Sequence, residues 1–133
     1  MTKTLLIADD NCVMRQIIKS TVVARGWQVV GEATDGQQAI DSYLRLKPDA
    51  VTMDLVMPEH DGLYGLTEIV RHDPAARVLI VSALDQTDVL KQAFRAGAAD
   101  FLVKPFDKNG LMEALDRMVP DTTSPITHAA ATS

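Results

Sequence analysis

Five polar residues stand where short apolar runs of the sequence end. Asp9 and Asp10 follow LLIA. Asp54, Ser82 and Lys104 close three later runs. If these runs are strands of one sheet, three carboxylates, a hydroxyl and an ammonium group converge. Three like charges in one cleft repel one another unless a cation neutralises them. Since hard oxygen ligands with room for water suit Mg²⁺, the residue types predict a magnesium site.

A carboxylate beside a divalent cation and a lysine is suited to accepting a phosphoryl group. In that chemistry an oxygen of Asp54 attacks phosphorus in line, while Lys104 pairs with a phosphoryl oxygen. Other catalytic patterns are missing from the sequence, which has no credible Ser-His-Asp or Cys-His arrangement and no helical Glu-x-x-His pair. Neither G-x-G-x-x-G nor G-x-x-x-x-G-K, the glycine-rich phosphate-binding motifs, occurs.

Apolar β-branched runs alternate with segments of helical period along the chain. The expected strands are residues 3–8, 27–33, 49–54, 77–83 and 100–103. The expected helices cover about 12–25, the segment between Asp35 and Pro48, about 63–72, about 87–96 and the segment after Asp107. The strands are continuous apolar runs, as in a parallel sheet with helices on both faces. Right-handed crossovers then predict a single flavodoxin-like, doubly wound α/β domain of five strands, in the order 2-1-3-4-5, and five helices.

The predicted topology explains why the five polar residues meet. In a sheet of this kind the ligand site lies beyond the carboxyl ends of the strands, where the strand order reverses. That point lies between the first and third strands, which end in Asp9 and Asp54. Ser82 and Lys104 reach the same edge from the fourth and fifth strands.

Length and composition favour one domain. A chain of 133 residues with 47% hydrophobic content forms one proper core, which we assign to residues 1–119. The segment 120–133 is rich in Thr, Ser, Ala and Pro and is expected to be a disordered tail.

Charge and cysteine content narrow the class of protein. The net charge of −5 argues against sequence-independent nucleic acid binding, which needs a basic face. The sequence has one cysteine, Cys12, so no internal disulfide forms and a reducing cytoplasm is expected. We expect Cys12 to be a small buried packing residue. No signal peptide or membrane-spanning run is recognised, and a monomer is expected.

Four motifs carry a resemblance to a known family. They are ADDN (8–11), VTMDLVMPEHDGL (51–63), IVSA (80–83) and FLVKPF (101–106). In this order and at these strand ends they resemble the receiver domain of bacterial two-component response regulators, most closely the stand-alone chemotaxis regulators of the CheY type. The resemblance covers about residues 3–119.

The resemblance implies a role for each acidic residue. Asp54 looks like the phosphoacceptor and Asp10 like a direct Mg²⁺ ligand, with Asp9 acting through a water molecule. The backbone carbonyl of Val56 would complete the metal shell. Many relatives carry a polar side chain at the position of Val56, so we expect a comparatively long-lived phosphorylated state.

The resemblance also implies roles on the fourth and fifth strands. Ser82 would donate its hydroxyl to the bound phosphoryl group, and Lys104 would pair with that group. The Lys104-Pro105 peptide is expected to be cis. Phe101 matches the switch aromatic, which in the family turns inward when the hydroxyl residue moves towards phosphate. An aromatic in a strand is usually a core residue, and that second interpretation has similar weight.

The implied function is a phosphorylation-activated signalling switch of a two-component, chemotaxis-type system. A histidine kinase would donate the phosphoryl group, and a changed surface would bind a target such as the flagellar motor switch. Such a protein catalyses only its own phosphorylation and dephosphorylation. One alternative is the excised receiver of a larger regulator such as a chemotaxis methylesterase. Another is a Mg²⁺-dependent aspartyl-phosphate phosphatase, which typically needs a second acid where Val56 stands.

Overall fold

The computed structural model describes residues 2–83 and 87–120, which form five strands alternating with five helices. The strands are β1 (Thr4–Ala8), β2 (Gln28–Ala33), β3 (Ala50–Asp54), β4 (Val78–Ala83) and β5 (Asp100–Lys104). The helices are α1 (Cys12–Val23), α2 (Gly36–Leu46), α3 (Gly62–His72), α4 (Thr87–Ala96) and α5 (Lys108–Met118). All strand pairs are parallel and the order is β2-β1-β3-β4-β5, which confirms the predicted flavodoxin-like topology.

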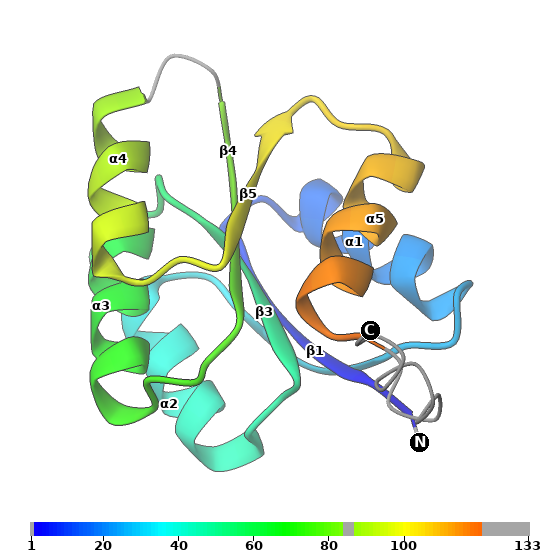
Figure 1. Ribbon diagram of the computed structural model, residues 1–133, viewed down its shortest axis with the longest axis horizontal. Helices are drawn as coiled ribbons and strands as arrows, with labels where there is room; N and C mark the ends of the chain where they lie inside the picture. The colour runs from blue at the N-terminus through cyan, green and yellow to red at the C-terminus, as the bar shows by residue number, and fades with distance from the viewer. Residues whose placement is uncertain (1, 84–86, 121–133) are drawn as a thin grey trace, which may run out of the picture.

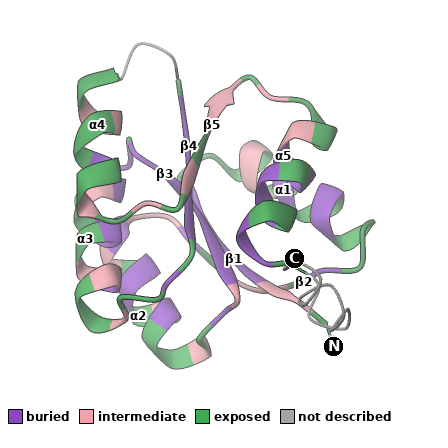
Figure 2. Cartoon of the chain, in the orientation of Figure 1, coloured by how far each residue is buried: buried purple, intermediate pink, exposed green. Residues whose placement is uncertain are grey.

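Helices cover both faces of the sheet. Figure 1 shows α2, α3 and α4 on one face and α1 and α5 on the other. Successive strand residues point to opposite faces, so Leu6 belongs to the core beneath α2, α3 and α4, whereas Leu5 and Ile7 belong to the core beneath α1 and α5. Each face of the sheet is covered by helices and carries its own buried core, and Figure 2 shows the central strands as buried. The central strands β1, β3 and β4 are therefore apolar at most positions rather than at alternate ones.

Side-chain caps start the helices directly after the loops that follow the strands. The carboxylate of Asp35 accepts a hydrogen bond from the backbone N–H of Gln38, and that of Asp107 accepts one from Gly110. Asn11 caps α1 in the same way. A cap satisfies backbone donors that the first helical turn leaves unpaired. Because Asn11 follows the end of β1 so closely, the acidic residues between strand and helix have little freedom.

The structure differs from two expectations and leaves most of a third outside its described residues. Cys12 is exposed, not buried, because it lies about 120° around α1 from the buried Ile18. The first helix ends at Val23, two residues before the predicted end. Of the predicted tail, Pro120 is exposed and residues 121–133 lie outside the described residues. Within the described part of the chain, no helix is long and apolar enough to cross a membrane.

Candidate functional site

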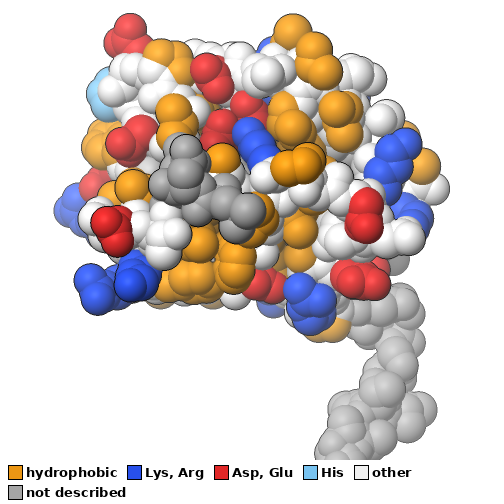
Figure 3. All heavy atoms as spheres, turned by 90° about the horizontal axis from the view of Figure 1, so that it is seen from above, with side chains coloured by type: hydrophobic (Ala, Val, Ile, Leu, Met, Phe, Trp, Pro, Cys, Tyr) orange, Lys and Arg blue, Asp and Glu red, His pale blue; other side chains and the backbone are white. Residues whose placement is uncertain are grey.

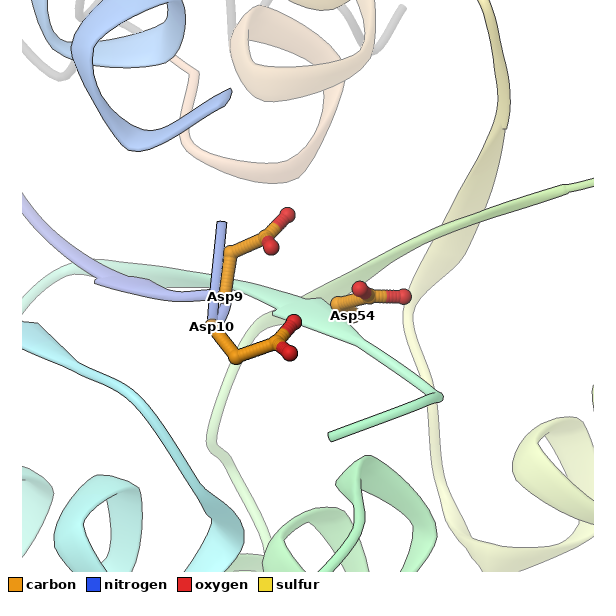
Figure 4. A group of neighbouring side chains, drawn as sticks. All are labelled: Asp9, Asp10 and Asp54. Atoms are coloured by element: carbon orange, nitrogen blue, oxygen red, sulfur yellow. The ribbon is translucent and has the colours of Figure 1, made fainter. Parts of the chain in front are cut away.

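The ends of β1 and β3 bring three carboxylates together, as the topology predicts. Asp9 and Asp10 follow β1 and Asp54 is the last residue of β3, and Figure 4 shows their side chains gathered at this edge. One oxygen of each residue lies within 4.8 Å of the others. Asp9 and Asp54 are buried, whereas Asp10 is exposed. Two carboxylates are thus fixed in the protein and the third faces water.

Lys104, the last residue of β5, bridges the two buried carboxylates. Its Nζ lies 3.2 Å from Oδ2 of Asp9 and 3.2 Å from Oδ2 of Asp54. Burial acts to lower the pKa of Lys104, but Asp54 and Asp9 together outweigh burial and raise it. Burial also raises the pKa of Asp54, and although Lys104 opposes this, the neighbouring Asp9 adds to it. Since three carboxylates meet one ammonium group, the cluster stays net negative.

These groups line a cavity of about 290 Å³ whose walls come from four strand ends. Its lining residues are Asp9, Asp10, Asn11, Asp54, Val56, Ala83 and Lys104. Figure 3, which looks onto this end of the molecule, shows acidic and basic side chains together within a largely apolar and uncharged surface. Hard oxygen ligands, surplus negative charge and access for water fit Mg²⁺, which keeps part of its water shell when bound by proteins.

Backbone contacts hold the buried carboxylates in place. Oδ1 of Asp9 accepts a hydrogen bond from the N–H of Asn11 at 2.9 Å, and Oδ1 of Asp54 accepts one from Val56 at 3.3 Å. The loop after β3 also folds back on the strand, because Gly62 donates its N–H to the carbonyl of Leu55 at 3.1 Å. A Cβ on Gly62 would collide with the backbone carbonyl of Asp54, so glycine permits this close approach.

Other predicted site residues surround the cluster. Ser82 is buried at the end of β4, next to the lining residue Ala83. Val56 is 57% exposed at the cavity mouth. The Lys104-Pro105 peptide is cis, as the resemblance implies. Phe101 is not a core residue in this structure, because it is 39% exposed and its ring packs edge-on against Phe94 of α4, with 5.6 Å between ring centroids.

Two residues beside the cluster, Asn11 and Arg15, were not among the predicted site residues. Asn11 caps α1 and also lines the cavity. An asparagine directly before a helical segment is a recognisable cap, so its position was open to prediction. Arg15 donates from Nη1 to the backbone carbonyl of Asp9 at 2.8 Å. The sequence does not reveal this contact, because its acceptor is a backbone atom and not a particular side chain.

Comparison with known proteins decides the family. The family model of the response regulator receiver domain matches residues 5–116. The chain belongs to the response regulator receiver family. This receiver is 43% identical to the chemotaxis protein CheY of Thermotoga maritima over 118 residues, which are 89% of the chain and 98% of that protein. It is 44% identical to CheY of Bacillus subtilis over 117 residues, with 88% and 98% covered.

Solved structures agree with this assignment. The receiver matches a chain of the CheX-CheY-BeF3-Mg²⁺ complex from Borrelia burgdorferi with a TM-score of 0.84 and 29% identity, covering 90% of each chain. It matches the response regulator domain of Thermotoga maritima CheB with a TM-score of 0.79 and 31% identity, covering 91% of this chain and 99% of that one. The protein is thus a CheY-like, phosphorylation-activated receiver, a phosphoacceptor signalling protein rather than an ordinary enzyme.

Proposed function

We propose that Asp54 accepts the phosphoryl group and that Asp10, Asp9 and the backbone carbonyl of Val56 hold Mg²⁺ beside it. The observation that carries this proposal is the bridge from Lys104 to both buried carboxylates inside an accessible, net negative cavity. Asp9 and Asp54 both belong to the acidic group and both contact Lys104. The choice of Asp54 as the acceptor is supported by the resemblance of VTMDLVMPEHDGL (51–63) to the receiver family.

The side chains divide the transfer chemistry between them. A carboxylate oxygen of Asp54 forms the new O–P bond as the P–N bond of the donor phosphohistidine breaks, and the histidine nitrogen leaves. Lys104 is already held at Oδ2 of Asp54 and is placed to pair with a phosphoryl oxygen. The Val56 N–H contact orients Asp54 before the donor arrives. Bound Mg²⁺ would supply charge stabilisation for the phosphoryl oxygens.

Ser82 and Phe101 form the proposed switch. Ser82 would donate its hydroxyl to the new phosphoryl group, and the resulting movement would draw Phe101 inward. Two features support this role. The residues lie on paired strands, with Ser82 opposite Val103 and Ile80 opposite Phe101. Phe101 is also half-exposed in this structure, so its side chain can still turn inward on phosphorylation.

The proposed partners follow from the relatives named CheY. A histidine kinase would donate the phosphoryl group, and the changed surface would bind a downstream target such as the flagellar motor switch. The support is an identity of 43–44% over nearly the whole length of two chemotaxis proteins. We place the protein in the cytoplasm, as a monomer that does not bind nucleic acid.

The first experiment is phosphorylation by acetyl phosphate, followed by intact mass with and without Mg²⁺. The wild type should gain one phosphoryl group only when Mg²⁺ is present, and Asp54→Asn should gain none. Asp88→Asn, at an exposed position in the first turn of α4, is the matched control and should behave like the wild type. Equal mass gain in Asp54→Asn would refute the assignment of the acceptor.

A further inference from the structure

Arg15 of α1 is a partly buried cation that contacts the backbone of the acidic cluster, and it is not one of the residues that line the cavity. Its side chain is 17% exposed. Nη1 donates to the backbone carbonyl of Asp9 at 2.8 Å, and Nε donates to Oε1 of Glu32 on β2 at 2.9 Å. The guanidinium group thus ties α1 to the ends of two neighbouring strands.

The carbonyl that Arg15 holds belongs to the peptide unit that joins Asp9 to Asp10. That unit is planar, so a rotation of its plane changes ψ of Asp9 and φ of Asp10 together. If one of these angles changes without an opposite change in the other, the Asp10 carboxylate moves relative to Asp9 and Asp54. The N–H of Asp9 is already fixed on the carbonyl of Ala33 at 3.0 Å. Arg15 therefore holds the carbonyl end of the peptide unit that joins the two acids.

We propose that Arg15 is a positioning residue for the Mg²⁺ site, which sets the direction of Asp9 and Asp10 by holding the peptide plane between them. This inference rests on the metal site of the proposed function. It assigns to Arg15 no contact with the metal ion or with the phosphoryl group.

Two effects of Arg15 on metal affinity oppose each other. A nearby positive charge repels Mg²⁺ and would weaken binding, whereas correct ligand geometry strengthens it. The charge of Arg15 is largely balanced by its ion pair with Glu32, at 2.9 Å. The effect of Arg15 on the geometry of the ligands should therefore outweigh the effect of its charge on Mg²⁺ affinity. Lysine at this position would keep the positive charge but lose one of the two hydrogen bonds. A single ammonium group cannot replace two N–H donors that are fixed in one plane.

The test is the Mg²⁺ dissociation constant of the full chain, measured from shifts of the Asn11 and Val56 amides in NMR titrations. The variants are Arg15→Lys and Arg15→Met, titrated at a temperature where circular dichroism shows each to be folded. Lys19 pairs with the same Glu32 at 3.8 Å, so Lys19→Met is the matched control. We expect both Arg15 variants to bind Mg²⁺ about 10-fold more weakly, at the lower end of the effect of residues that orient metal ligands. Lys19→Met should bind like the wild type.

Each other outcome is decisive. If Arg15→Met binds Mg²⁺ more tightly and Arg15→Lys is unchanged, Arg15 acts through its charge and the proposal is wrong. Unchanged affinity in both variants, with a lower melting temperature, would leave Arg15 only a role in stability. If Arg15→Met does not fold, Arg15→Lys alone still tests the proposal, because an unchanged Mg²⁺ affinity in that variant would refute it. A wild type that binds no Mg²⁺ would overturn the metal site itself. If the wild type binds Mg²⁺ and the Arg15 variants bind it equally well, only the role of Arg15 is refuted and the proposed function stands.

Discussion

Replacing Lys104 with methionine tests how the acidic cluster is held together when no metal ion is bound. Methionine keeps much of the length and the apolar contacts of the side chain, but it removes the ammonium group that lies 3.2 Å from each buried carboxylate. At an effective dielectric constant of about 20, each contact is worth about 5 kcal/mol before the cost of desolvation is subtracted. The variant leaves Asp9 and Asp54 facing each other without that compensation.

The net cost is smaller than the two contacts alone. Removing one partner of a buried ion pair typically lowers the free energy of unfolding by about 3–5 kcal/mol. We expect about 3 kcal/mol, the lower end, because water reaches the cluster through the cavity. For a domain of this size the melting temperature should fall by about 10 °C.

The assay is urea unfolding followed by circular dichroism, in EDTA and again in saturating Mg²⁺. Mg²⁺ neutralises the same carboxylates, so the difference between wild type and Lys104→Met should narrow when the ion is present. By reciprocity, the variant should bind Mg²⁺ more tightly than the wild type does. Lys91→Met, at an exposed position on α4, supplies the control. A difference of the same size in EDTA and in Mg²⁺, or no difference in EDTA, would refute the charge-balance argument.

Three further substitutions test other parts of the structure. The hydroxyl of Tyr43 donates to Oδ2 of Asp73 at 2.6 Å, a bond that lowers the pKa of Asp73, so Tyr43→Phe should lower the free energy of unfolding by about 1 kcal/mol at neutral pH. Because the folded-state pKa of Asp73 is depressed, this difference should be complete above about pH 4 and vanish as the pH falls through the folded-state value; urea titrations in which it persists in acid would contradict the assignment. Gly62→Ala should destabilise the protein by about 3 kcal/mol, because the added Cβ meets the carbonyl of Asp54, and an unchanged thermal melt would show that the loop after β3 adjusts easily. Val56→Asn should shorten the half-life of the phosphorylated protein, measured by intact mass after the donor is removed, since the new amide helps to place the attacking water; an unaltered half-life would remove Val56 as the cause of slow decay.

The fold was predictable because its elements have simple patterns. β3 and β4 are buried at nearly every position between two helical layers, so their sequences are continuous apolar runs with clear ends. Asp35 and Asp107 mark helix starts by a local bond to the backbone three residues on. From these elements the parallel order followed, and with it the meeting of residues up to 95 positions apart, as between Asp9 and Lys104.

Features that depend on tertiary detail escaped prediction. Helical period places Phe94 on the apolar face of α4, yet it is 43% exposed and lies against Phe101 of β5. Both rings are shielded by each other rather than by the core, a pairing across two elements that no local pattern contains. The bond from Arg15 to the carbonyl of Asp9 escaped for a similar reason, since its acceptor is a backbone atom that every residue has.

The negative charge of the cluster explains why several hydrogen bonds and ion pairs are needed to keep its carboxylates in place. Without a metal ion, one ammonium group faces three carboxylates, and phosphorylation of Asp54 would replace its single negative charge with about two on the phosphoryl group, a net gain of about one. Lys104 contacts Asp9 and Asp54 together, so it could release Asp9, which would help to hold Mg²⁺, and still remain beside the modified residue. We therefore expect the cation and Lys104 to be needed most after transfer, when the negative charge is greatest. The phosphorylated state should then lose more stability than the unmodified state when Mg²⁺ is withdrawn, and that loss would limit how long the activated surface persists.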